Sequence, residues 1–73
     1  MNATSEVMAL LETGHWFSFE DLASKCSFPK CQVELVLNFL TKFEFVQKDE
    51  IKNFFRLSPR MKKLIKTLNE KSA

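Results

Sequence analysis

"SFEDLASKCSFPKCQVELVLNFLTKFEFV" (residues 18–46) contains two helix starts about nine residues apart. Ser18 is a typical N-cap residue whose hydroxyl can accept a hydrogen bond from the backbone N–H of Asp21, while the Asp21 carboxylate reaches back as a short-armed capping box. Phe17, before the cap, and Leu22, four positions after it, match the hydrophobic staple that often accompanies such a cap. This pattern predicts that a helix begins directly after Ser18.

The second helix start lies at Ser27, which we expect to cap a helix with Pro29 in its first turn and an end at about Phe43. The first helix then occupies about 19–26, so only two or three residues separate the two helices. A connection this short forces a sharp corner instead of an antiparallel hairpin, and the stretch therefore predicts a helix-turn-helix.

One helix is expected before this stretch. Thr4 or Ser5 can cap it, and Gly14, the only glycine, suits the left-handed position that ends a helix. Residues 15–17 then form a short extended bridge. The apolar stripe of this helix consists of Val7, Met8, Leu10 and Leu11.

A β-hairpin and a last helix are expected after it. Residues 45–48 and 53–57 have the character of two strands around a polar tip of Asp49 and Glu50. Ser58 caps the last helix and Pro59 opens it, while 69–73 are expected to fray. Its apolar stripe consists of Met61, Leu64, Ile65 and Leu68.

Composition excludes several classes of protein. The 73 residues suit a single domain over 1–73, and 45% hydrophobic and 27% charged residues are typical of a folded chain. No segment approaches the length of a membrane span and no secretory signal is evident, so we expect a cytoplasmic protein without membrane contact. One histidine, no phosphate-binding glycine loop and no nucleophile–base spacing argue against an enzyme, a metal site or a cofactor.

Cys26 and Cys31 are expected to be reduced thiols, with a redox switch or half of an intersubunit metal site as alternatives.

Charge is distributed unevenly along the chain. Residues 1–46 contain three basic and six acidic residues, which gives −3, whereas residues 47–73 contain eight basic and three acidic residues, which gives +5. A basic second half can attract a polyanion. The exposed face of a solvated helix is also often rich in basic residues. Both interpretations, a polyanion-binding surface and a solvated helix face, therefore stay open.

Together the elements resemble the winged helix-turn-helix superfamily over nearly the whole chain. This resemblance implies an α+β fold with a three-helix core, a two-stranded β-hairpin wing and a C-terminal helix. Many members have glycine between the third helix and the wing, where this chain has Glu44, so we expect a different turn there and a longer third helix. The resemblance is carried by Leu22, Ala23, Val33, Leu37, Leu40, Phe45, Val46 and the run Phe55–Ser58.

The resemblance also implies double-stranded DNA as the partner. The third helix, about 28–43, would enter the major groove, and the wing, about 45–57, would contact the backbone or the minor groove. On a helical wheel Val33, Val36, Leu37, Leu40 and Phe43 form its core face. The candidate DNA contacts are Ser27, Lys30, Cys31, Gln32, Glu34, Leu35, Asn38 and Lys42, followed by Lys48, Lys52 and Arg56 in the wing.

Two further partners are predicted. Leu35 and Phe39 fall on the outward side of the third helix, where apolar side chains favour a protein partner over DNA. The last helix could join two copies through Met61, Leu64 and Leu68, unless this stripe covers the domain's own core. The main prediction is a homodimeric DNA-binding regulator of transcription, and the alternative is a protein–protein interaction module.

Overall fold

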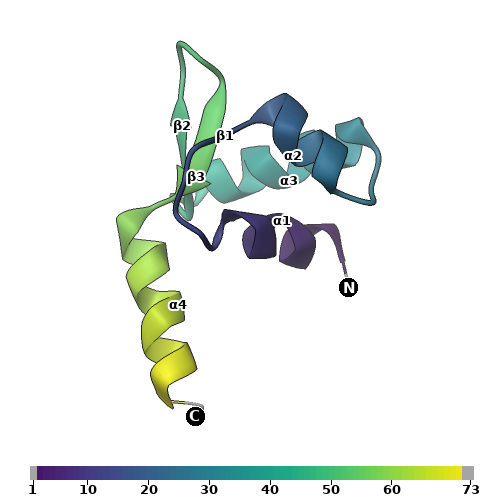
Figure 1. Cartoon of the computed structure of the whole chain (residues 1–73). Coiled ribbons are helices and arrows are strands. Elements are labelled where there is room, and N and C mark those ends of the chain that lie inside the picture. Colours follow the sequence, from purple (N-terminus) through teal and green to yellow (C-terminus); the bar gives the residue numbers. More distant parts are fainter. Residues whose placement is uncertain (1, 72–73) are drawn as a thin grey trace.

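The elements follow one another in the expected order, with one added strand. The computed structural model describes residues 2–71, which form four helices and three strands (Figure 1). The predicted α+β class is confirmed. None of the helices in the described range has the length and apolar content needed to cross a membrane. The elements are α1 (Ala3–Leu11), β1 (Phe17–Ser18), α2 (Phe19–Lys25), α3 (Lys30–Lys42), β2 (Val46–Asp49), β3 (Phe54–Leu57) and α4 (Pro59–Lys71).

The sheet has three strands, where the sequence predicted two. It is antiparallel with the order β1-β3-β2, and the expected extended bridge supplies the edge strand β1. Phe17 lies opposite Phe55 across β1 and β3, and Val46 lies opposite Leu57 across β2 and β3. A strand of two residues is too short to show the alternation of apolar and polar residues by which strands are recognised.

The core lies where α1, α2 and α3 meet one face of the sheet. The predicted burial of Leu22, Val33, Leu37 and Leu40 is confirmed, and Ala23 is also buried. Phe43 was expected on the core face of α3, but its side chain is 52% exposed, because it follows the last turn of that helix. The core side chains are Val7, Leu11, Leu22, Val33, Leu37, Leu40, Val46, Phe55 and Leu57.

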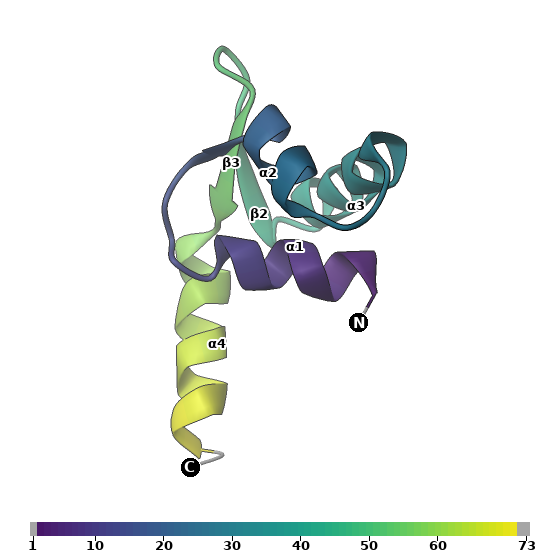
Figure 2. The same ribbon diagram turned by 45° about the vertical axis from the view of Figure 1, so that its right-hand side comes forward.

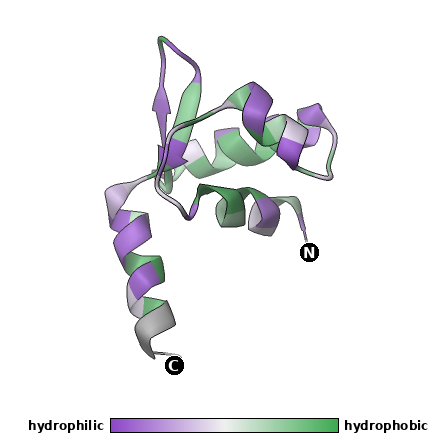
Figure 3. Cartoon of the chain, in the orientation of Figure 1, coloured by the Kyte–Doolittle hydropathy of each residue, from purple (hydrophilic) through white to green (hydrophobic). Residues whose placement is uncertain are grey.

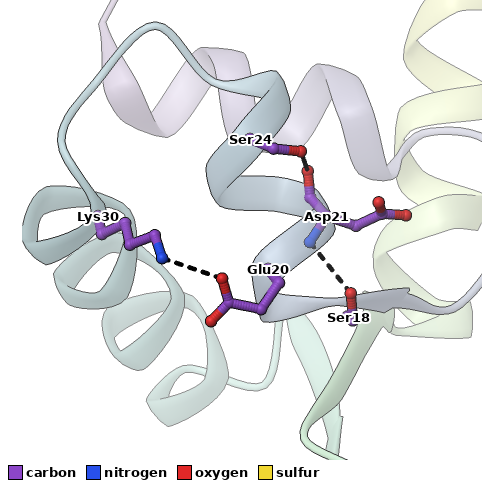
Figure 4. A network of polar contacts seen from close by, with 5 residues as sticks. All are labelled: Ser18, Glu20, Asp21, Ser24 and Lys30. Atoms are coloured by element: carbon purple, nitrogen blue, oxygen red, sulfur yellow. Dashed lines mark hydrogen bonds and ion pairs between the residues drawn. The ribbon is translucent and has the colours of Figure 1, made fainter.

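Two of the predicted helix caps are correct. The backbone N–H of Asp21 donates to Ser18 Oγ at 3.0 Å, and that of Met61 donates to Ser58 Oγ at 3.2 Å. The Asp21 carboxylate points away from Ser18, so the capping box is not completed (Figure 4). For α1 the prediction of Thr4 or Ser5 is wrong, since Asn2 caps this helix through its side-chain oxygen, 2.8 Å from Ser5 N.

Ser27 does not cap α3. Its backbone N–H and its hydroxyl both donate to the Glu6 carboxylate of α1, at 2.6 and 2.9 Å. Pro29 takes the N-cap position without a side-chain bond, and four residues, 26–29, separate α2 from α3. The corner between α2 and α3 is therefore held by hydrogen bonds to the Glu6 carboxylate of α1, a helix outside the helix-turn-helix.

Gly14 is confirmed as a left-handed residue after α1. Its φ is 82°, and its N–H donates to the carbonyl oxygen of Leu11 at 3.1 Å. A Cβ at this position would meet only the flexible end of the Lys62 side chain, which can move aside. The positive φ of the turn after α1, and not the space around it, is therefore what favours glycine here.

Glu44 has the left-handed conformation that glycine usually supplies, with a φ of 63°. Its N–H donates to the Thr41 carbonyl at 3.0 Å, and the Phe45 N–H donates to the Leu40 carbonyl at 2.9 Å. These two bonds form a Schellman cap. The expectation of a different turn and a longer helix is therefore wrong: α3 ends at Lys42, and Glu44 takes on a conformational cost of about 1 kcal/mol.

The last predicted feature concerns the end of the chain. Residues 69–73 were expected to fray, but α4 extends to Lys71. Residues 72 and 73 lie outside the described range.

Replacing Glu44 by glycine is expected to stabilise the fold. Glu44→Gly removes the left-handed strain, whereas Glu44→Ala removes the carboxylate and keeps the strain. We expect the free energy of unfolding of the glycine variant to exceed that of the alanine variant by about 0.5–1 kcal/mol in urea titrations. Equal stabilities of the two variants would contradict a strained residue at this position.

Candidate nucleic-acid interface

One side of α3 faces away from the core along its whole length. Burial of Val33, Leu37 and Leu40 fixes the rotation of the helix and leaves its other side in solvent. We call this side the outer α3 face. It consists of Cys31, Gln32, Glu34, Leu35, Asn38 and Lys42, all of which are exposed.

The β2–β3 hairpin adds Lys48 to this face. Lys48 shares a groove of about 220 Å³ with Glu34, Asn38 and Asn53. Its ammonium lies 5.8 Å from the centre of the Phe55 ring and 3.9 Å from a Glu50 carboxylate oxygen. An amide that can read a base edge and a cation that can bind phosphate therefore lie in one groove.

The tip of the hairpin is held by Asp49. Its carboxylate accepts from the backbone N–H of Ile51 at 3.0 Å and from that of Lys52 at 3.2 Å. Asn53, expected to begin the second strand, lies instead in the turn with a φ of 56°. The fixed turn presents Lys52 and the 95% exposed Ile51 to solvent. Sequence reasoning did not single out Ile51, because an isolated apolar residue in a turn has no periodic signal.

Lys30 is tied to the start of α2. Its ammonium lies 3.0 Å from a Glu20 carboxylate oxygen, next to the Ser18 cap (Figure 4). Both side chains are mostly exposed, so this ion pair contributes no more than about 1 kcal/mol. Lys30 can therefore exchange Glu20 for another anion at low cost.

Two predicted contacts are not brought to the outer α3 face. Arg56 lies opposite Gln47 and alternates with Phe55, so it projects from the other side of the sheet. There its guanidinium lies 4.6 Å from the centre of the Trp16 ring, and its Nε donates to Gln47 Oε1 at 2.8 Å. Ser27 is near α3 but is bonded to Glu6.

The charges around the outer α3 face balance. The lysines of α3 and of the hairpin tip are Lys30, Lys42, Lys48 and Lys52, the last of which lies beside Trp16, and the nearby acids are Glu20, Glu34, Asp49 and Glu50. Four positive charges thus meet four negative ones. The excess of positive charge lies on α4, where residues 59–68 contain Arg60, Lys62, Lys63 and Lys66 and no acid.

An aromatic cluster follows the end of α3. Phe39 and Phe43 have ring centres 4.8 Å apart, and Phe43 stacks on Phe45 at 6.3 Å. Their side chains are 52%, 52% and 39% exposed. Leu35, one turn before Phe39, is 69% exposed. The sequence indicated Leu35 and Phe39, while Phe43 and Phe45 were assigned to the core and to a strand.

The predicted dimer contacts on α4 divide into two groups. Met61 is half-buried and packs against the core of its own chain, together with Ile65. Leu64 and Leu68 are 50% and 56% exposed. Coverage of the domain's own core is therefore confirmed for Met61, whereas pairing of two copies through Leu64 and Leu68 stays a prediction.

The two cysteines differ in environment. Cys31 is exposed at the start of α3, and Cys26 is half-buried at the end of α2. Burial raises the pKa of the Cys26 thiol above its ordinary value, and the charge of Glu6 raises it further. Within the described residues, no group of three or more histidine, cysteine, aspartate or glutamate side chains could hold a metal ion.

Comparisons with known proteins find nothing similar to this chain: no family model matches it, and neither a curated protein nor a solved structure does.

The thiol environments predict different reactivity. Because a raised pKa lowers the thiolate fraction at a given pH, Cys26 should alkylate several-fold more slowly than Cys31 at pH 8. Its rate should keep rising with pH above the ordinary thiol range. Glu6→Gln should accelerate the alkylation of Cys26, since it removes one of the two causes of the raised thiol pKa. Mass spectrometry of peptides after timed iodoacetamide treatment measures both rates, and a Cys26 that reacts first would contradict the assignment.

Proposed function

We propose that this chain is a winged helix-turn-helix protein that binds double-stranded DNA and regulates transcription. In this proposal α3 enters the major groove and the β2–β3 hairpin, acting as the wing, contacts the backbone or the minor groove. The observation that supports it best is the groove shared by Asn38 and Lys48, because it joins the exposed side of a helix to a hairpin. The element order, the corner between α2 and α3 and the left-handed residue before β2 are consistent with it.

Individual residues can be given separate tasks. Asn38 is suited to paired hydrogen bonds with adenine, and Gln32 presents the same amide chemistry on the other margin of the outer α3 face. Lys42, Lys48 and Lys52 are suited to phosphate, as is Lys30 when it leaves Glu20. Glu34 can accept from cytosine, and Leu35 and Cys31 offer apolar contact to a thymine methyl.

The charge balance sets the expected strength of binding. Four lysine–phosphate contacts correspond to a slope of about −4 in a plot of log K against log salt. The four nearby acids oppose the same phosphates, so one copy should bind weakly and only at low salt. Two copies on adjacent half-sites would double the contacts, which makes pairing important for this function.

DNA binding can be tested with two matched variants. A duplex selected from a random pool is titrated with protein, and anisotropy is followed over a range of salt. Lys48→Ala should weaken binding to all sequences and reduce the salt slope by about 1, whereas Asn38→Ala should mainly relax sequence preference. Lys66→Ala, on α4, is the charge-matched control. No binding at low salt, or an equal loss in the control, would reject the proposal.

A second function is favoured by the exposure of Leu35 and Phe39. In this alternative the domain is an interaction module whose outer α3 face binds a protein. Protein binding requires an apolar side chain at position 35, whereas DNA binding tolerates a neutral polar one. A neutral polar substitution of Leu35 therefore distinguishes the two functions.

Leu35→Gln should weaken DNA binding by no more than a few-fold, because it removes one apolar contact to a thymine methyl but adds no charge. In the alternative, the same change should remove a protein partner that Lys48→Ala retains. Pull-down of one defined partner with both variants measures the difference. Retention of that partner by Leu35→Gln would exclude this face as its docking site.

A further inference from the structure

We infer that the outer edge of β2 binds an extended peptide of another protein, which adds to the sheet as a further strand. The peptide runs antiparallel to β2 and ends in a free carboxylate at the start of α4. The main-chain groups that bind it are not used in the proposed DNA contacts, so peptide binding does not depend on DNA binding.

β2 is an edge strand whose outward main-chain groups are available. In the order β1-β3-β2 it pairs with β3, and no strand of the described range pairs with its other side (Figure 1). The Ser58 N–H donates to the Phe45 carbonyl at 3.1 Å, so Phe45 directs this carbonyl toward β3. Because the direction alternates along an antiparallel strand, Gln47 also bonds to β3, whereas Val46 and Lys48 point their N–H and C=O groups outward.

The side chains of β2 make the main chain the principal means of recognition. After Val46 the strand contains only polar residues, and Figure 3 shows it as hydrophilic. β2 therefore offers no apolar patch of the kind that marks docking through side chains. An added strand supplies partners for the outward N–H and C=O groups whatever the side chains are. An extended peptide is thus the chemical class that fits this edge.

A cleft of about 650 Å³ lies along the same edge. Val46, Gln47 and Lys48 form one of its walls, and Trp16, which is 42% exposed, adds an aromatic surface. Four strand residues at about 3.3 Å each span about 13 Å, so the edge accommodates about four peptide residues. We expect an apolar side chain of the peptide to lie against Trp16.

One end of the cleft favours a negative charge. Ser58, Pro59 and Arg60 line it where α4 begins and leads away from the sheet (Figures 1 and 2). The positive end of the α4 dipole therefore lies at the cleft, and the first turn contains Arg60 and no acid. Glu44 lines the same cleft, but in the described part of the chain no ion pair joins it to Arg60. The Arg60 guanidinium is thus available to an anion of the partner.

Strand direction places the end of the peptide at this positive end. Ser58 bonds to Phe45, directly before the first residue of β2, so α4 begins beside Val46. An antiparallel partner runs toward Val46 and ends there, which brings its terminal carboxylate to Arg60. Thr41 lines the cleft too, and its buried hydroxyl oxygen has no hydrogen-bond partner among the described residues. Rotation about the Cα–Cβ bond lets this hydroxyl donate to the carboxylate.

Fluorescence titration tests the predicted preference for a carboxylate. The chain has one tryptophan and no tyrosine, so its intrinsic fluorescence reports on Trp16 in the cleft. The probes are acetyl-Thr-Val-Thr-Leu with a free carboxyl end and the same peptide as its C-terminal amide. The free acid should bind with a dissociation constant of about 1 mM or lower. The amide should bind at least about threefold more weakly.

Two variants of α4 locate the carboxylate. Arg60→Gln should remove the difference between the acid and the amide, because it removes the cation at the end of the cleft. Lys62→Gln is the charge-matched control, since the Lys62 side chain lies beside Gly14 and outside the cleft. It should keep the difference.

Two substitutions of Lys48 separate main-chain binding from side-chain binding. Lys48→Pro removes the outward N–H and leaves the bonds to β3, which an edge strand tolerates. Lys48→Ala removes the same side chain but keeps the N–H. The proline variant should bind the free acid at least about tenfold more weakly than the alanine variant. Amide NMR spectra and unfolding curves establish that both variants are folded.

Methylation of single amides of the peptide makes the same test on the unchanged protein. Amides that face β2 alternate along the peptide with amides that face away from it. Methylation should therefore abolish binding at every second position. Loss at every position, or at none, would contradict the addition of a strand.

Three further outcomes overturn the inference: no fluorescence change up to about 10 mM free acid, equal binding by the two Lys48 variants, or a carboxylate preference that persists in Arg60→Gln. A single-stranded oligonucleotide that changes Trp16 fluorescence where the peptide does not would assign the cleft to nucleic acid instead. All these measurements are made without duplex DNA, so failure here is distinguishable from failure of the proposed function.

Discussion

Burial of one side of α3 is the constraint on which the rest of the structure depends. Val33, Leu37 and Leu40 are almost completely inaccessible, and they bring α3 against α1, α2 and the sheet. Because residues on a helix recur about every 3.6 positions, this burial also decides which residues face solvent. The core and the outer α3 face are thus two results of one packing arrangement.

Much of the fold could be predicted from local patterns. Ser18 and Ser58 were found as caps because a hydroxyl before an apolar stripe is a local signal, and Leu22 and Leu37 were found as core residues by periodicity. The prediction failed at Ser27, whose local pattern is equally good. Its hydroxyl is taken by Glu6, 21 positions earlier in the chain, and no local pattern reports so distant a partner.

The candidate site was only partly predictable for the same reason. Exposure of Asn38 and Lys42 follows from the wheel of a single helix, so it could be anticipated. The position of Arg56 depends on the register of β3 and on Trp16, which lies 40 positions away. Phe43 was misplaced because the wheel was continued past the residue where the helix ends. Helix ends and strand registers are set by tertiary contacts, and these decide where long side chains go.

The link between Glu6 and Ser27 bears on how the α2–α3 corner holds its shape. The Glu6 carboxylate accepts one bond from the backbone N–H of Ser27 inside the loop and one from its hydroxyl, and Glu6 belongs to a helix that lies outside the two-helix unit. The angle between α2 and α3 thus depends on α1. A peptide trimmed to residues 17–46 would leave that amide to water and lose the brace, so this motif is not an autonomous module that could be grafted elsewhere by itself.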